Sequence, residues 1–261
     1  MKSWVLLVML TGVIHSFCFG QDSEEPAVSG KELRRQRIDA LVKQEEEGVI
    51  VFPRHWAGGF KLTSDGYGGF VEMGLAKSIR GAWLFQLEMV ERKHPREQKY
   101  ELDPSTPPII YRKVNYFYPF RLGVQQQYLL GNKSNKNGIS ITANYGGGIS
   151  LGLIRPYLVE VNKDGRRTFI SYESDSSLFK GLEFYGGPSL TEGWNKLKLN
   201  PGIYCKSGLR FDYGRHNEML NALEVGFTAE LFSNSIRQMV DVDPSQYFAS
   251  LYVSIVFGRR E

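Results

Sequence analysis

Residues 138–156 read GISITANYGGGISLGLIRP and alternate between apolar and small or polar side chains. One parity carries Ile139, Ile141, Ala143, Tyr145, Ile149, Leu151 and Leu153. The other carries Ser140, Thr142, Asn144, Gly146, Gly148, Ser150 and Gly152. Successive side chains of a strand point to opposite faces, so this stretch predicts a strand with one apolar face. The alternation persists for about fifteen residues, enough for a tilted strand to cross a membrane.

The same alternation recurs along the chain, with turn residues between the runs. It predicts eight strands: Trp56–Ser64, Phe70–Lys77, Ala82–Arg92, Asn115–Tyr128, 138–156, Gly202–Tyr213, Leu223–Leu231 and Leu251–Phe257. Pro119 is the misfit, because proline cannot donate to a strand ladder. We therefore expect a bulge at Pro119 or a later start of that strand.

Two further observations favour a transmembrane barrel over a soluble β-protein. The second face of these strands is rich in Gly, Ala, Ser and Thr, which suits a narrow, filled interior. Connections 78–81, 130–138 and 214–221 are short, while 93–110, 155–200 and 233–246 are long, and only 65–68 breaks this alternation. Outer-membrane barrels have short periplasmic turns, long outer loops and an even strand number. The sequence therefore predicts an all-β, eight-stranded antiparallel transmembrane barrel over 51–261.

The N-terminal part has two predicted segments. Lys2 followed by an apolar run predicts a secretory signal peptide over 1–20, cleaved after Gly20. Residues 21–50 are charged and predict a periplasmic arm with a short helix over 31–47, for which Ser29 and Glu32 fit a capping box. A solvated arm is favoured over a docking helix.

Charge and cysteine content narrow the function classes. Removing Lys2 takes the formal net charge from +4 to +3, which is too little to indicate nucleic-acid binding. Cys205 is the one cysteine after residue 20, so no internal disulfide can form in the mature chain. No later run approaches eighteen consecutive apolar residues, so the sequence predicts no membrane-spanning helix.

Five stretches stand out along the chain: KHPRE at 93–97, NYFYPFRLGVQQQ at 115–127, YGGGISLGLIRPYLVEV at 145–161, GWNKLKLNPGIYCKSGL at 193–209 and LYVSIVFGRR at 251–260. Together they resemble small outer-membrane β-barrel proteins of Bacteroidota. The resemblance covers most of the chain after residue 50 and implies a barrel located in the outer membrane. It implies no catalytic residue. The C-terminus departs from many barrels, because Phe257 is followed by GRRE rather than ending the chain.

Charged residues on the inward face form the main candidate site. Glu88 and Arg121 fall on neighbouring strands, as do Lys206 and Arg210 against Glu224 and Glu230. These six residues could line a selective pore or proton path, or form an ion-paired plug. An eight-stranded interior is just wide enough for side chains to fill, and buried charges persist mainly when paired. The plug is the favoured interpretation.

His94 is the histidine that falls on a predicted outer rim, whereas His55 begins the first strand and His216 lies in a predicted periplasmic turn. A lipid hydrolase would need a nucleophile beside His94, and a protease would need an acid. The candidates are Ser105, Thr106, Ser233 and Ser235 as nucleophiles, and Asp103, Asp241 and Asp243 as acids. No motif joins any of them to His94. The sequence predicts no metal site and no cofactor, and it places Cys205 toward lipid.

The leading functional hypothesis follows from a barrel with no pore and no active site. Its function should then reside in its surfaces, as an interaction or accessory subunit of a larger outer-membrane complex for protein assembly, secretion or transport. Its expected partners are outer-membrane lipid and other proteins. The alternative is a lipid-modifying or proteolytic barrel enzyme that uses His94. A small-solute channel is the third hypothesis.

Overall fold

The computed structural model describes residues 52–78, 80–101, 108–133, 138–163, 166–179, 186–188, 191–214 and 218–261. They belong to a compact unit that spans Glu46–Glu261. The predicted signal peptide 1–20, the arm 21–50 and its helix 31–47 lie outside the described residues.

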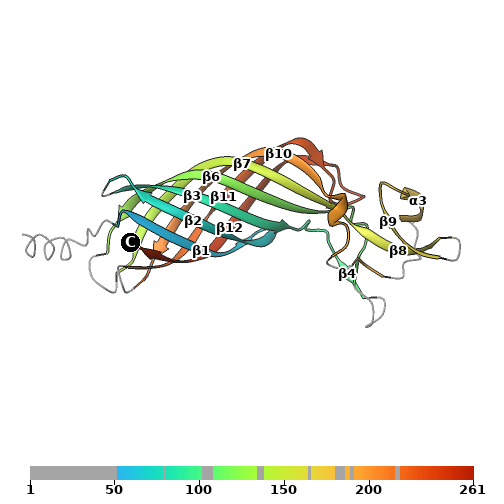
Figure 1. The fold of residues 1–261 in the computed structure, drawn as a ribbon, viewed down its shortest axis with the longest axis horizontal. Helices are drawn as coiled ribbons and strands as arrows, with labels where there is room; N and C mark the ends of the chain where they lie inside the picture. The colour runs from blue at the N-terminus through green and yellow to red at the C-terminus, as the bar shows by residue number, and fades with distance from the viewer. Residues whose placement is uncertain are drawn as a thin grey trace, which may run out of the picture. The chain divides into compact units, whose positions relative to one another are not determined.

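Eight antiparallel strands close into a barrel (Figure 1), in the order β1-β12-β11-β10-β7-β6-β3-β2. The strands are β1 (Arg54–Thr63), β2 (Gly66–Ala76), β3 (Gly81–Arg92), β6 (Asn115–Gly131), β7 (Ser140–Pro156), β10 (Lys198–Asp212), β11 (Met219–Ile236) and β12 (Ser245–Arg260). The predicted all-β, eight-stranded antiparallel barrel is confirmed. Among the described residues, no helix is long and apolar enough to cross a membrane.

The two faces of the wall follow the parity of the sequence. On β7, the side chain of Ile149 is 63% exposed, whereas Asn144 and Ser150 are buried inside the barrel. The inward face carries glycines where the neighbouring strands come closest. A Cβ at Gly148 would meet the backbone of Leu122 and Gly123, so a side chain cannot be accommodated there without displacing the wall. The barrel is therefore apolar outside and packed inside.

The connections segregate by length to the two ends of the barrel. The segments between β2 and β3, β6 and β7, and β10 and β11 are short, and they lie at the end where Arg54 and Glu261 exchange backbone hydrogen bonds of 3.0 and 2.8 Å. We call this the terminus end. The connections after β3, β7 and β11 lie at the opposite, loop end, together with the tight turn between β1 and β2.

Pro119 neither delays β6 nor shifts its register, contrary to the expectation from sequence. It pairs with Gly152 in an unbroken register with β7. On the other edge, the pairing with β3 stops after Phe120 and resumes at Phe117 in the same register. The missing N–H of proline therefore opens the β3 ladder locally while the β7 ladder holds the strand in place.

The long connections contain secondary structure of their own at the loop end. The connection after β3 holds β4 (Lys99–Tyr100) and β5 (Ile109–Ile110), and the connection after β7 holds the hairpin β8 (Leu158–Lys163) and β9 (Arg166–Ser171). Two short helices follow, α3 (Ser176–Phe179) and η1 (Trp194–Lys196). A hydrophobic cluster joins these pieces: Ile110, Tyr157, Val159, Val161, Ile170 and Phe179. We call this assembly the outgrowth; it has a core separate from the lumen.

The seam between β1 and β12 leaves part of one strand edge unpaired. β1 ends at Thr63, opposite Tyr252, and Ser64 N–H donates to the carbonyl of Leu251 at 2.8 Å. β12 begins at Ser245 and pairs there with β11 alone. Backbone groups of an antiparallel strand alternate between its two neighbours, so Ala249, like Leu251, directs its N–H toward the β1 side. In the described chain no strand faces it there.

This edge gives a sharp test of the seam. Ala249→Pro should change the free energy of unfolding by no more than about 0.5 kcal/mol, because the lost N–H is outside any ladder. The matched control is Val253→Pro. Val253 has the same strand parity as Ala249 and also directs its side chain outward, but its backbone pairs with Leu62 of β1. Val253→Pro should lower the free energy of unfolding by at least about 1 kcal/mol. Urea unfolding followed by heat-modifiable gel mobility measures both, and equal losses would contradict the assigned seam.

Candidate functional site

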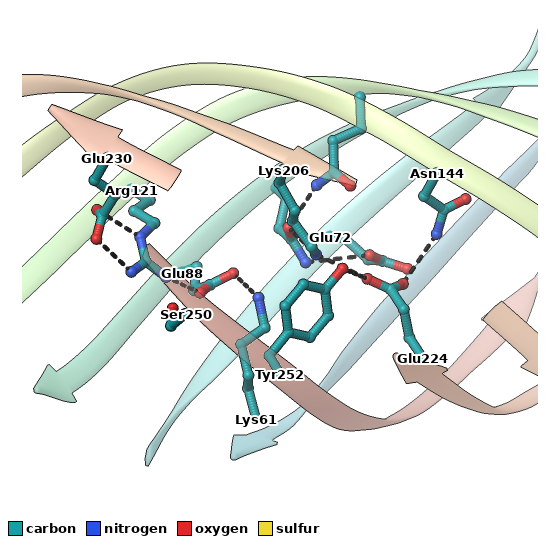
Figure 2. A network of polar contacts seen from close by, with 12 residues as sticks. Lys61, Glu72, Glu88, Arg121, Asn144, Lys206, Glu224, Glu230, Ser250 and Tyr252 are labelled. Atoms are coloured by element: carbon teal, nitrogen blue, oxygen red, sulfur yellow. Dashed lines mark hydrogen bonds and ion pairs between the residues drawn. The ribbon is translucent and has the colours of Figure 1, made fainter. Parts of the chain in front are cut away.

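The inward charges form two clusters inside the barrel (Figure 2). In the first, Arg121 of β6 donates to both oxygens of Glu230 at 2.8 Å each and also pairs with Glu88 of β3. Lys61 of β1 pairs with the same Glu88. Arg92, at the end of β3, lies 3.0 Å from Glu230 and 2.6 Å from Asp65. The guanidinium of Arg121 thus joins the carboxylates of Glu88 and Glu230 across the lumen.

The second cluster is centred on Glu224 of β11. Its carboxylate pairs with Lys206 at 2.9 Å and with Arg210 at 2.6 Å. Asn144 and the hydroxyl of Tyr252 also donate to it, at 2.9 and 2.8 Å. Every oxygen of this buried carboxylate therefore has a donor, which is the condition for keeping a charge away from water.

Glu72 extends the second cluster across the barrel to β2. Arg210 donates to its two oxygens at 2.6 and 2.8 Å, a bidentate geometry. The side-chain amide oxygen of Gln86 accepts hydrogen bonds from the Gln125 side chain at 2.5 Å and from the Lys206 ammonium at 3.0 Å. The cluster thus ties strands that are not neighbours in the wall.

Tyr252 of β12 separates the two clusters. The ammonium of Lys61 lies 4.3 Å from the centre of its ring and that of Lys206 lies 4.8 Å from it. Both distances are within the range of a cation–π contact. The aromatic ring holds apart two cations that would otherwise repel each other in a confined interior.

The charges in this network balance. The side chains joined by ion pairs in the two clusters are five cations and five acids: Lys61, Arg92, Arg121, Lys206 and Arg210 against Asp65, Glu72, Glu88, Glu224 and Glu230. Five minus five leaves no net charge.

Each predicted lumen residue lies inside the barrel. Glu88, Arg121, Lys206, Arg210, Glu224 and Glu230 are all buried. Lys206 and Arg210 pair with Glu224 as strand neighbours, but Glu230 pairs across the lumen with Arg121 and Arg92. Sequence reasoning left out Lys61, Glu72, Arg92 and Asp65. Strand parity already placed Glu72 and Arg92 inward, whereas the glycine-rich first strand gave no clear parity for Lys61.

The loop end of the lumen is closed by aromatic packing. Phe117 lies 5.3 Å from Phe232 and 5.2 Å from Phe248 between ring centres, and Ile236 completes the layer. Above it, the β11–β12 connection reaches the start of β6, where Val114 N–H donates to Gln238 at 2.8 Å. β7 and β10 separate β6 from β11 in the wall, so this connection spans the end of the barrel.

Near the terminus end, Ala57, Leu220, Ala222 and Val256 form a buried apolar cluster with Phe70, on four neighbouring strands of the barrel. Asp212 pairs with Arg260 there and accepts a hydrogen bond from Gly214 N–H at 2.9 Å. The terminus end therefore combines an apolar cluster with ion-paired and hydrogen-bonded polar side chains.

His94 has local partners at the loop end. Its Nδ1 accepts a hydrogen bond from the backbone N–H of Arg96 at 3.2 Å. The backbone N–H of His94 donates to the Glu97 carboxylate at 3.0 Å. Burial lowers the pKa of His94, against the opposing effect of Glu97. Ser105, Thr106 and Asp103 lie outside the described residues. Within the described chain, His94 has no hydrogen bond to Ser233, Ser235, Asp241 or Asp243. His216 also lies outside the described residues.

Two other sequence predictions concern metal binding and cysteine. Within the described parts of the chain, no group of three or more His, Cys, Asp and Glu side chains could hold a metal ion. Cys205 is exposed on the outer wall, as its parity predicts.

Comparison with known proteins gives similarity to solved structures alone. No family model matches the chain, and no curated protein does. Neisserial surface protein A is 11% identical over 80% of this chain and 95% of its own, with a TM-score of 0.36. The N-terminal β-barrel domain of Pseudomonas aeruginosa OprF is 11% identical over 79% and 98%, with a TM-score of 0.31. Ail, the attachment invasion locus protein of Yersinia pestis, solved with the heparin analogue sucrose octasulfate, is 8% identical over 79% and 96%, with a TM-score of 0.34.

Similarity at this level adds nothing about function, whereas the two faces of the barrel wall define its class. Its charges face inward and its large apolar side chains face outward, with Phe60, Leu251 and Ile203 exposed by 75%, 66% and 61%. This arrangement is the inverse of a water-soluble protein. It defines an eight-stranded barrel of the membrane-spanning type.

The network predicts a large asymmetry between buried and exposed ion pairs. Arg121→Met should lower the free energy of unfolding by about 3–5 kcal/mol, because it removes the cation shared by Glu88 and Glu230. Lys198→Met is the control, since its pair with Glu173 is exposed by 59% on both sides. Lys198→Met should lower the free energy of unfolding by less than about 1 kcal/mol. Equilibrium urea unfolding in detergent compares the two variants, and similar losses would contradict a structural role for the lumen network.

Proposed function

We propose that the protein is a non-catalytic, non-conducting β-barrel of the outer membrane. It acts through its surfaces, as an interaction or accessory subunit of a larger outer-membrane complex for protein assembly, secretion or transport. The long connections and the outgrowth face the cell exterior and the terminus end of the barrel faces the periplasm, as is usual for such barrels. Lipid covers the apolar wall.

The observation that carries this proposal is the filled lumen. Charge-paired side chains occupy its centre, an aromatic layer packs across the loop end, and a further apolar cluster lies near the terminus end. A barrel of eight strands has little room left for water once these side chains are in place. A solute path is therefore not favoured, and the external surfaces remain as the functional parts.

The outgrowth supports a role in protein interaction. Its hairpin buries Val159, Val161 and Ile170 in the hydrophobic cluster and leaves residues 166–169 exposed, including Phe169 at 41%. Arg155 fixes the outgrowth to the barrel rim, because its guanidinium lies 4.2 Å from the ring centre of Tyr116 and 5.0 Å from that of Trp194. Such an ordered surface, anchored on a rigid wall, suits recognition of another protein.

Native-gel analysis after gentle detergent extraction tests the accessory role. The protein should migrate in a complex larger than the barrel alone. Replacing the hairpin, residues 158–171, with a short Gly-Ser linker should abolish this complex while the barrel still shows heat-modifiable mobility. Migration as a free barrel from the unmodified membrane, or a complex unaffected by the replacement, would contradict the proposal.

Conductance measurements test the closed lumen. The purified protein in planar bilayers should show no stable open channel, because the central charges are paired and an aromatic layer packs across the loop end. Arg121→Ala should also remain without steady current, because the layer of Phe117, Phe232 and Phe248 does not include Arg121. Steady ion-selective currents from the unmodified protein that change in Arg121→Ala would overturn the plug.

A further inference from the structure

Four basic side chains at the terminus end have no acidic partner in the described chain. They are Arg54 on β1, Lys77 after β2, Arg80 in the turn before β3 and Arg259 on β12, and all four are exposed. Their strands are neighbours in the wall, since β12 pairs with β1, β1 with β2 and β2 with β3. The four cations therefore gather on one sector of the barrel.

Two exposed tryptophans lie in the same sector. Trp56 is 59% exposed and pairs directly with Arg259 across the seam. Trp83 is 39% exposed, and the ammonium of Lys77 lies 5.8 Å from the centre of its ring. Tryptophan on the outer wall of a membrane protein marks the boundary between hydrocarbon and headgroups. The cations next to these rings are therefore at headgroup level.

Several basic side chains at the loop end are ion-paired, unlike these four. Arg112 lies 2.5 Å from Asp241, Lys113 lies 2.7 Å from Glu97 and Lys198 lies 2.6 Å from Glu173. The four cations of the terminus-end sector are therefore available to bind an external anion.

We propose that this basic rim, formed by Arg54, Lys77, Arg80 and Arg259 with Trp56 and Trp83, binds the headgroups of anionic phospholipids. The proposal rests on the membrane-embedded barrel of the proposed function. Arginine offers a planar fork of donors that matches a phosphate, and long basic side chains reach from an apolar wall to the headgroup layer. Basic clusters next to a membrane are attracted to anionic lipid.

Charge argues for this occupant over a second copy of the chain. Two copies joined through this sector would bring like charges together, which disfavours association. A phosphodiester with net negative charge complements the rim, and the barrel wall already stands in the layer that supplies it.

Tryptophan fluorescence provides the test. In a Trp194→Phe background, Trp56 and Trp83 are the tryptophans left after residue 20. The protein is reconstituted in phosphatidylcholine nanodiscs that contain either brominated phosphatidylglycerol or brominated phosphatidylcholine at the same mole fraction. The anionic lipid should reach half-maximal quenching at a mole fraction about fivefold lower for each cation engaged. High salt should remove this preference by screening.

Two matched sets of substitutions locate the effect. Changing Arg54, Lys77, Arg80 and Arg259 to Gln should abolish the preference for phosphatidylglycerol. Changing Arg96, Lys99, Arg166 and Lys196 to Gln, four exposed cations of the loop end, should leave it intact. If the first set does not fold, the salt titration of the unmodified protein decides.

The outcomes separate this inference from the proposed function. Equal quenching by both lipids at low salt would overturn the rim while leaving the barrel in the membrane. A preference that survives the rim substitutions would also overturn it. Absence of quenching by either lipid would contradict the membrane-embedded barrel itself.

Discussion

Charge compensation in a confined interior is the constraint on which the rest of the structure depends. A buried ion without a partner loses several kcal/mol of solvation free energy, so a narrow barrel can hold charges only in sets that neutralise each other. Here Arg121 and Arg210 each hold two carboxylates from different strands. The same contacts that remove the charge cost also tie together walls that share no hydrogen-bond ladder.

The apolar exterior and the polar interior are two consequences of one closed sheet. Closure pairs nearly every backbone group, which permits the outer wall to contact lipid. It also fixes the diameter of the lumen, which in turn demands small residues such as Gly148 between larger ones such as Tyr204. The unpaired edge of β12 lies above the β1–β2 turn, where the wall ends earlier on one side than on the other.

The two ends of the barrel differ in chemistry as well as in length. The loop end combines aromatic closure, an anchored outgrowth and ion-paired rim charges. The terminus end has short turns, an Asp212–Arg260 pair and exposed cations beside tryptophan. The proposed function assigns protein contact to the loop end, and the proposed basic rim assigns lipid headgroups to the terminus end.

The sequence by itself determined the eight barrel strands and, outside the glycine-rich first strand, the direction in which their side chains face. Parity along residues 138–156 places Asn144 and Ser150 inside and Ile149 outside, because a strand alternates whatever its partners are. It also placed Glu88, Arg121, Lys206, Arg210, Glu224 and Glu230 in the lumen. Only the tertiary structure decided which charges meet. Glu230 contacts Arg121 and Arg92 rather than Lys206, since contacts across a lumen depend on the curvature and stagger of the closed sheet. The ordered outgrowth and the closing layer of Phe117, Phe232 and Phe248 were likewise decided by packing between segments distant in sequence, which no local pattern encodes.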